Sequence, residues 1–159
     1  MKLTFREGQE ADLPAVVALL ADDVLGRARE DASLPLDPAY LTAFREMQAQ
    51  GGNRLILAEA EEDGSRRIVG CLQLVVLPGI SLKGTRRAQV EGVRVAGDQR
   101  GGGLGRQLLG HAIDLARAEG CGLLQLTADA SRADTHRFYK SLGFTASHLG
   151  FKLKLDPEC

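Results

Sequence analysis

The apolar positions of this chain change repeatedly between a spacing of two residues, typical of strands, and a spacing of three to four, typical of helices. The clearest boundaries are those of a helix that Asp37 can cap, Pro38 can begin and Gly51 can end. The pattern predicts strands at about 3–5, 55–60, 68–77, 88–95, 123–127 and 151–155, and helices at about 13–20, 38–50, 104–119 and 133–142. A hairpin turn is expected at residues 61–65. Strands joined first by a hairpin and later through helices predict an α/β fold, a mixed sheet with helices on both faces.

Composition narrows the class of protein. The 159 residues suit one domain, 1–159, with a self-sufficient core. A net charge of −1, no Trp and 4% aromatic residues give neither a basic groove nor a stacking platform, so we expect no nucleic-acid partner. No apolar stretch is long enough for a signal peptide or a bilayer span, which predicts a cytoplasmic protein without a membrane partner. Cys71, Cys121 and Cys159 lack metal-ligand spacing, so we expect reduced thiols and no metal site.

A glycine-rich stretch follows the strand expected at 88–95 and opens the helix expected at 104–119. Residues 100–106 read Arg-Gly-Gly-Gly-Leu-Gly-Arg. Glycines let the backbone approach a ligand without Cβ obstruction, and the first helical turn then presents unpaired N–H groups and the positive end of the helix dipole. This combination predicts a site for a phosphate or pyrophosphate.

Spacing separates the known phosphate-binding loops. A Walker A loop needs a glycine, four further residues and then Gly-Lys-Ser/Thr, and a dinucleotide fingerprint needs Gly-x-Gly-x-x-Gly. Residues 100–106 satisfy neither. They do fit Arg/Gln-x-x-Gly-x-Gly/Ala, as Arg100, Gly103 and Gly105. In this respect the stretch resembles the coenzyme A loop of the GNAT superfamily of N-acetyltransferases.

A second stretch strengthens the resemblance. Residues 135–144 read Thr-His-Arg-Phe-Tyr-Lys-Ser-Leu-Gly-Phe, similar to the Ala-x-x-Leu/Phe-Tyr-x-x-Leu-Gly-Phe helix of that superfamily. Arg132 stands where many relatives have asparagine. The resemblance implies a GNAT-like fold, a mostly antiparallel twisted sheet with helices on both faces, and acetyl-CoA as cosubstrate. The residues it implies for binding acetyl-CoA are Val93, Val95, Arg100, Gly101, Gly102, Gly103, Gly105 and Arg106.

Acyl transfer from a thioester to an amine poses two proton problems, because the ammonium must lose a proton and the departing thiolate benefits from gaining one. The resemblance implies that the Tyr139 hydroxyl points at the sulfur and acts as the acid. Glu91 is the expected base, acting directly or through a water, with His136 as the alternative. At a period of two residues Glu91 should face the same side as Val93 and Val95, unless a bulge in this strand, which the resemblance makes an alternative, alters the facing.

The predicted function is an N-acetyltransferase that moves an acetyl group from acetyl-CoA to a primary amine by direct attack in a ternary complex. The acceptor is left open, as a small-molecule or peptide amine, and so is homodimer formation. The resemblance implies an acceptor groove made by residues 21–36 and the turn at 148–150. Acids in the first segment could attract a cationic amine, but Arg27 and Arg29 lie among them: Asp22, Asp23, Glu30 and Asp31. The alternatives are a non-catalytic acyl-CoA-binding or sensing module and a generic nucleotide-binding domain.

Overall fold

The structure, a computed structural model, describes residues 1–158, so the thiol expected at Cys159 lies outside the described residues. The chain packs as two compact units, Met1–Leu126 and Thr127–Cys159, and each is described by itself. The expectation that residues 1–159 form one domain stays a prediction.

The first unit holds one sheet and most of the helices. Its strands are β1 (Lys2–Glu7), β2 (Asn53–Glu62), β3 (Ser65–Leu77), β4 (Arg87–Val95) and β5 (Leu123–Leu126). Its α-helices are α1 (Leu13–Ala21), α2 (Pro38–Gln50), the short α3 (Ser81–Gly84) and α4 (Leu104–Ala118), with 3-10 turns η1 (Glu10–Asp12), η2 (Gly26–Ala28) and η3 (Gly97–Gln99).

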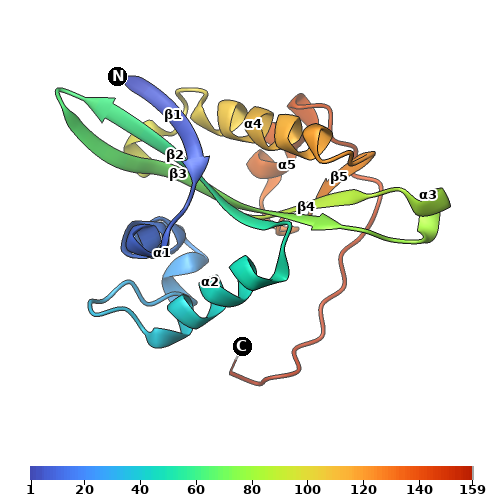
Figure 1. Cartoon of the computed structure of the whole chain (residues 1–159), viewed down its shortest axis with the longest axis horizontal. Helices are drawn as coiled ribbons and strands as arrows, with labels where there is room; N and C mark the ends of the chain where they lie inside the picture. The colour runs from blue at the N-terminus through green and yellow to red at the C-terminus, as the bar shows by residue number, and fades with distance from the viewer. Residues whose placement is uncertain (159) are drawn as a thin grey trace. The chain divides into compact units, whose positions relative to one another are not determined.

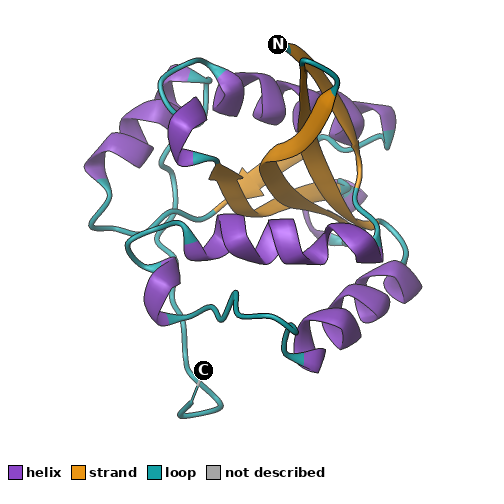
Figure 2. Cartoon of the chain, turned by 90° about the vertical axis from the view of Figure 1, so that its left-hand side faces the viewer, coloured by secondary structure: helices purple, strands orange, loops and turns teal. Residues whose placement is uncertain are grey.

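The sheet has the strand order β1-β2-β3-β4-β5. The pairs β1–β2, β2–β3 and β3–β4 are antiparallel, whereas β5 runs parallel to β4. Helix α4 covers one face of the sheet, and α1 and α2 lie against the other (Figures 1 and 2). The mixed sheet with helices on both faces agrees with the prediction.

The core of this unit lies on both faces of the central strands. Leu108 and Leu109 of α4 are fully buried, as are Leu72 and Leu74 of β3. Gly70 lies where space is short, because a Cβ there would come within 3.2 Å of the Arg94 backbone oxygen and 3.4 Å of Leu108 Cδ2. Core packing therefore fixes α4 above the middle of the sheet.

Local signals set the boundaries as expected. The Asp37 carboxylate accepts a hydrogen bond from the N–H of Ala39 at 2.9 Å, and Pro38 begins α2. Asp63 and Gly64 both have positive φ, +50° and +77°, in the tight turn between β2 and β3. The predicted helix cap and hairpin are confirmed.

The second unit contains α5 (Ala133–Ser141), where a helix was expected. The strand predicted at residues 151–155 is not formed, and that prediction is wrong for this structure. Phe151, Leu153 and Leu155 are each at least 85% exposed. The alternation of apolar and polar residues predicts which face of a sheet each side chain would occupy. A strand also needs a neighbouring strand to hydrogen-bond its backbone, and a local pattern does not specify that neighbour.

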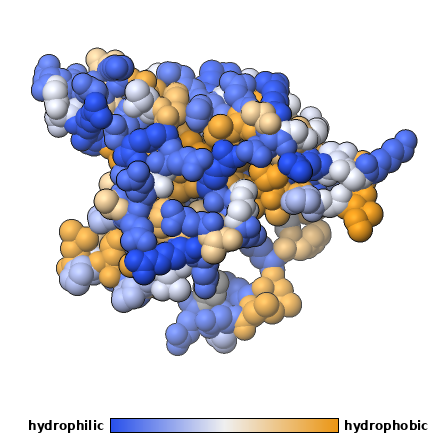
Figure 3. Space-filling view, viewed as in Figure 1, coloured by the Kyte–Doolittle hydropathy of each residue, from blue (hydrophilic) through white to orange (hydrophobic). Residues whose placement is uncertain are grey.

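The surface is mainly polar, with a local apolar projection. Figure 3 shows apolar side chains exposed beside α3, where Ile80 is 95% and Leu82 66% exposed. Within residues 1–158, no helix combines the length and the apolar character that crossing a membrane requires.

Candidate active site

The sheet opens along one edge of β4. Pairing between β4 and β5 ends at Val90 and Leu126, but β4 continues to Val95. Within the first unit, the backbone of residues 91–95 therefore has no strand partner on its β5 side. Such an edge presents N–H and C=O groups that an extended ligand can pair with. It leads directly into the glycine-rich stretch.

A bulge interrupts β4 at this place. Gly92 and Val93 together lie opposite Leu72, because β4 has one residue more than β3 between two successive paired positions. Gly92 has a φ of +60°, a value that glycine adopts readily. An isolated glycine inside an apolar strand is the sequence signal that indicates such a bulge.

The bulge changes the face on which Glu91 lies. Glu91 and Arg94 pair with residues two apart on β3, so their side chains share a face, and Arg94 contacts Asp23 beyond α1 at 3.7 Å. Val93 and Val95 alternate with Arg94 and lie on the opposite face. The prediction that Glu91 faces the same side as Val93 and Val95 is therefore wrong, because the extra residue shifts the alternation by one.

The glycine-rich stretch forms an open loop at the N-terminus of α4. Gly101 and Gly103 have φ values of +80° and +83°, and nothing lies within 4 Å of the place where a Cβ would sit. Gly103 caps α4, whose first turn carries no acidic residue. Open space, glycine-only backbone and the positive end of a 15-residue helix suit an anionic ligand such as a pyrophosphate.

Arg100, expected to bind acetyl-CoA, uses its side chain within the protein. Its guanidinium donates to the backbone oxygen of Val95 at 3.1 Å and to that of Asp22 at 2.7 Å. It also pairs with the Asp22 carboxylate at 3.4 Å. The side chain thus ties the glycine-rich loop to the end of α1, while Arg106 lies in the first turn of α4.

The exposed Glu91 carboxylate has a defined neighbour. Its Oε1 accepts a hydrogen bond from Nε2 of Gln89 at 2.9 Å, and Gln125 of β5 donates to Gln89 at 2.7 Å. Neither glutamine was predicted from the sequence, because no motif contains it. Two signals in the sequence point to them. Gln89 lies two residues before Glu91 and so faces the same side of β4, and Gln125 lies on the strand expected to pair with β4.

A buried thiol lies under the bulge. Cys71 is 1% exposed, and its Sγ lies 3.9 Å from the backbone oxygen of Gly92. Burial raises the pKa of the Cys71 thiol to about 12, although the nearby Arg94 charge opposes that rise. The thiol is therefore neutral at physiological pH and is a poor nucleophile.

The acids of the expected acceptor segment, residues 21–36, are bound by other groups of the protein. Asp22 pairs with Arg100, Asp23 with Arg94, and Glu30 accepts a hydrogen bond from the Tyr40 hydroxyl at 2.7 Å. Hydrogen bonds from Ser33 lower the pKa of Asp31. Residues 34–36 of the segment also line an apolar cavity of about 620 Å³ beside α1 and α2.

Tyr139 belongs to the second unit, on α5. Its ring packs against Phe138, with centroids 5.4 Å apart, and edge-on against Phe144 at 5.7 Å. The backbone oxygen of Tyr139 accepts hydrogen bonds from Leu142 and Phe144, which ends the helix. On the same helix, Nε2 of His136 lies 2.8 Å from the backbone oxygen of Asp129.

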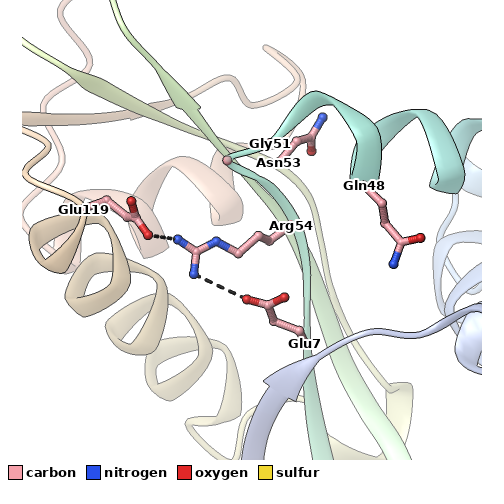
Figure 4. A pocket seen from close by; sticks show the side chains of 7 residues that line it. Glu7, Gln48, Gly51, Asn53, Arg54 and Glu119 are labelled. Carbon is pink, nitrogen blue, oxygen red and sulfur yellow. Dashed lines mark hydrogen bonds and ion pairs between the residues drawn. The ribbon is translucent and has the colours of Figure 1, made fainter.

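A separate polar cavity of about 420 Å³ lies near the C-terminal end of α4 (Figure 4). Arg54 bridges Glu119 and Glu7 there, with 3.4 Å between Arg54 Nη1 and Glu7 Oε1. The glycine-rich loop lies at the other end of α4, about 22 Å away for a helix of this length. The charged groups of Glu7, Arg54 and Glu119 pair with one another and so connect β1, β2 and the end of α4. This cluster contains none of the predicted site residues.

Comparisons with known proteins agree with this geometry. Residues 21–144 match the model of the acetyltransferase (GNAT) family. A crystal structure from Bacillus halodurans C-125, described as a transcriptional regulator, is 45% identical with a TM-score of 0.90, over 97% of this chain and 100% of that one. The L-methionine sulfoximine/L-methionine sulfone acetyltransferase of Pseudomonas aeruginosa is 29% identical over 147 residues, 92% of this chain and 83% of the relative. Glucosamine 6-phosphate N-acetyltransferase of Trypanosoma brucei brucei is 28% identical over 96% of both chains.

The chain therefore belongs to the GNAT acetyltransferase family, and it has the α/β GNAT fold with a mixed five-strand sheet. It is an acetyl-CoA-dependent N-acetyltransferase, like its homologues. The family and the fold class inferred from the two sequence motifs are confirmed.

Proposed function

We propose that this protein transfers the acetyl group of acetyl-CoA to a primary amine by direct attack in a ternary complex. The observation that carries the proposal is the unpaired edge of β4 at residues 91–95, which runs into a Cβ-free loop at the N-terminus of α4. An extended pantetheine arm can pair with such an edge, while the pyrophosphate takes the helix N-terminus. The residues proposed to hold acetyl-CoA are Val93, Val95, Arg100, Gly101, Gly102, Gly103, Gly105 and Arg106.

In the proposed reaction Glu91 accepts a proton from the acceptor ammonium, so that the neutral amine can attack the thioester carbonyl. A carbon–nitrogen bond forms and the carbon–sulfur bond breaks. Tyr139 supplies a proton to the departing thiolate, and the extra proton of the attacking nitrogen then restores the Tyr139 hydroxyl. The N–H of Val93 polarises the carbonyl oxygen. The neutral, buried Cys71 supports direct attack over a cysteine-bound acetyl intermediate. His136 remains the alternative base.

The proposed acceptor is a small-molecule amine. Two relatives are named for L-methionine sulfoximine or L-methionine sulfone and for glucosamine 6-phosphate, and these three amines are the first to test. Because the acids at 22, 23, 30 and 31 already bind groups of the protein, they support no preference for a polycationic acceptor. A cytoplasmic location is also part of the proposal.

The alternative left open by the sequence, a family member that binds or senses acyl-CoA without turnover, makes a different prediction. The name of the Bacillus halodurans protein, a transcriptional regulator, favours it. Both candidates predict that acetyl-CoA stabilises the fold. Only the enzyme releases coenzyme A faster when an amine is added.

The test is a thiol-release assay with acetyl-CoA and the amine panel, with the product identified by mass spectrometry. An acetylated amine whose formation follows thiol release supports the proposed function. Stabilisation by acetyl-CoA without release above background would support the sensing module instead.

A further inference from the structure

We propose that Gln89 and Gln125 are positioning residues that hold the Glu91 carboxylate for proton transfer. This inference rests on the proposed role of Glu91 as the base. It starts from three polar side chains linked in a row across β5 and β4: Gln125 donates to Gln89 at 2.7 Å, and Gln89 donates to Glu91 at 2.9 Å.

The backbone keeps this row in register. Gln89 and Gln125 are paired positions of the parallel β4 and β5 strands, and Glu91 follows Gln89 by two residues on the same face. Both glutamines are half-buried, whereas Glu91 is exposed. The two amides therefore lie on rigid strands beneath a carboxylate that reaches solvent.

The row has a direction that chemistry fixes. An amide side chain can present either its oxygen or its NH₂ group to a neighbour. The Glu91 carboxylate can only accept, so Gln89 turns its NH₂ group toward Glu91 and its oxygen toward Gln125, which donates to it. The opposite orientation would place a carbonyl oxygen against a carboxylate. Gln125 thus satisfies the Gln89 oxygen and stabilises the orientation of Gln89 that Glu91 requires.

The hydrogen bond leaves half of the carboxylate for the substrate. Oε1 of Glu91 is held by Gln89, and no group within residues 1–158 hydrogen-bonds Oε2. A base must keep its accepting oxygen within hydrogen-bond reach of the amine, and a freely rotating exposed carboxylate does so only part of the time. We therefore assign Oε2 as the proton acceptor.

Two variants at position 125 test whether the side chain there must donate a hydrogen bond to Gln89. In Gln125→Lys the ammonium still donates to Gln89, so kcat should stay within about threefold of wild type. In Gln125→Glu the carboxylate accepts from Gln89, which then turns its oxygen toward Glu91, and kcat should fall about tenfold, the scale of one hydrogen bond to a charged group. KM for acetyl-CoA should stay unchanged in both. Equal loss in the two variants would overturn the proposal, since a packing role would not distinguish them.

Gln89→Leu should lower kcat like Gln125→Glu, and Gln73→Leu is the matched control. Gln73 is paired with Glu91 on β3 but donates to Asn53 at 2.9 Å rather than to Glu91. In the free protein, the side-chain NH₂ resonances of Gln89 should move in Glu91→Gln and Gln125→Glu but not in Gln73→Leu. Unmoved resonances in Glu91→Gln would overturn the contact itself.

Glu91→Gln distinguishes this inference from the proposed function. Loss of kcat in Glu91→Gln with full kcat in Gln89→Leu would keep Glu91 as the base and overturn the positioning role alone. Full kcat in Glu91→Gln would overturn the base assignment and the positioning role together. Loss in both variants, with Gln73→Leu unaffected, is the result we expect.

Discussion

Arg100 of the glycine-rich loop donates a hydrogen bond from Nη2 to the backbone oxygen of Asp22, 2.7 Å away at the end of α1. The two residues are 78 positions apart in the sequence. Gly97 lies against the same place, because a Cβ there would approach Asp22 Oδ2 to 3.3 Å. This contact links the proposed acetyl-CoA loop to the first residues of the proposed acceptor segment.

Removing the link should weaken coenzyme A binding without unfolding the protein. Arg100→Met loses the bonds to Asp22 and Val95 while keeping the aliphatic stem, so the loop is no longer held in place before the ligand binds. The guanidinium is half exposed, and we expect Kd for coenzyme A to rise about three- to tenfold. Calorimetric titration measures it. Arg117→Met, an exposed change at the other end of α4, is the control, and equal affinities in both variants would contradict the expectation.

The loop itself can be tested at Gly103. Gly103→Glu should abolish stabilisation by coenzyme A, because the new side chain fills the open space and brings negative charge to the helix N-terminus. The positive φ adds a strain of about 1–2 kcal/mol. Gly64→Glu in the β2–β3 turn carries the same kind of strain and should keep the ligand response. Thermal melts with and without coenzyme A compare the two, and a retained response in Gly103→Glu would move the binding site elsewhere.

Tyr139→Phe removes one hydroxyl and keeps the ring that packs against Phe138 and Phe144. If the hydroxyl protonates the departing thiolate, kcat should fall about 10²-fold or more, while KM for acetyl-CoA and the melting temperature change little. Steady-state kinetics on one identified amine, with matched melting curves, provide the measurement. Full kcat in the variant would remove Tyr139 from the mechanism.

Acid stability should depend on Asp12. Arg6 donates to both Asp12 oxygens, at 2.8 and 2.9 Å, and this bidentate pairing lowers the pKa of the carboxyl although burial opposes the shift. A lowered pKa stabilises the fold above about pH 4, and that contribution disappears as the pH falls through the folded-state value. Asp12→Asn should therefore cost roughly 1–2 kcal/mol at neutral pH, allowing for solvent around Arg6, and less in acid. Denaturant melts across this range measure it. The exposed Asp114→Asn should change little at any pH.

Cys71 should resist alkylation in the folded protein. Its burial and raised pKa leave almost no accessible thiolate at neutral or mildly alkaline pH. Iodoacetamide followed by peptide mass spectrometry should find Cys71 labelled only after denaturation in guanidinium. Labelling of the native protein at Cys71 would show that the region under the β4 bulge opens readily.

Local signals in the sequence predicted most of the first unit. The Asp37 cap, the Asp63-Gly64 turn and the glycine loop before α4 depend on neighbours in the chain, and all three form as expected. The face of Glu91 was predicted wrongly, because Gly92 inserts a bulge that strict alternation does not include. The contact between Arg100 and Asp22 joins distant segments, so only the folded chain reveals it.

The residues around Glu91 illustrate the same limit. Gln89 and Gln125 are unremarkable polar residues in the sequence, and their row with Glu91 exists only because β4 and β5 pair in one register. The strand predicted at 151–155 does not form, because a strand depends on pairing with a segment that is distant in the sequence. Motifs therefore predicted the family and the loop, whereas tertiary pairing supplied the surroundings of the proposed base.

The reaction proposed for this protein is transfer of an acetyl group from acetyl-CoA to an amine. The most direct measurement is coenzyme A release from acetyl-CoA in the presence of L-methionine sulfone, L-methionine sulfoximine, glucosamine 6-phosphate and a broader amine panel, with mass-spectrometric detection of the product. We expect amine-dependent release, one molecule of N-acetylated amine for each thiol, and loss of both in Glu91→Gln. Acetyl-CoA binding without release above background for every amine would contradict it.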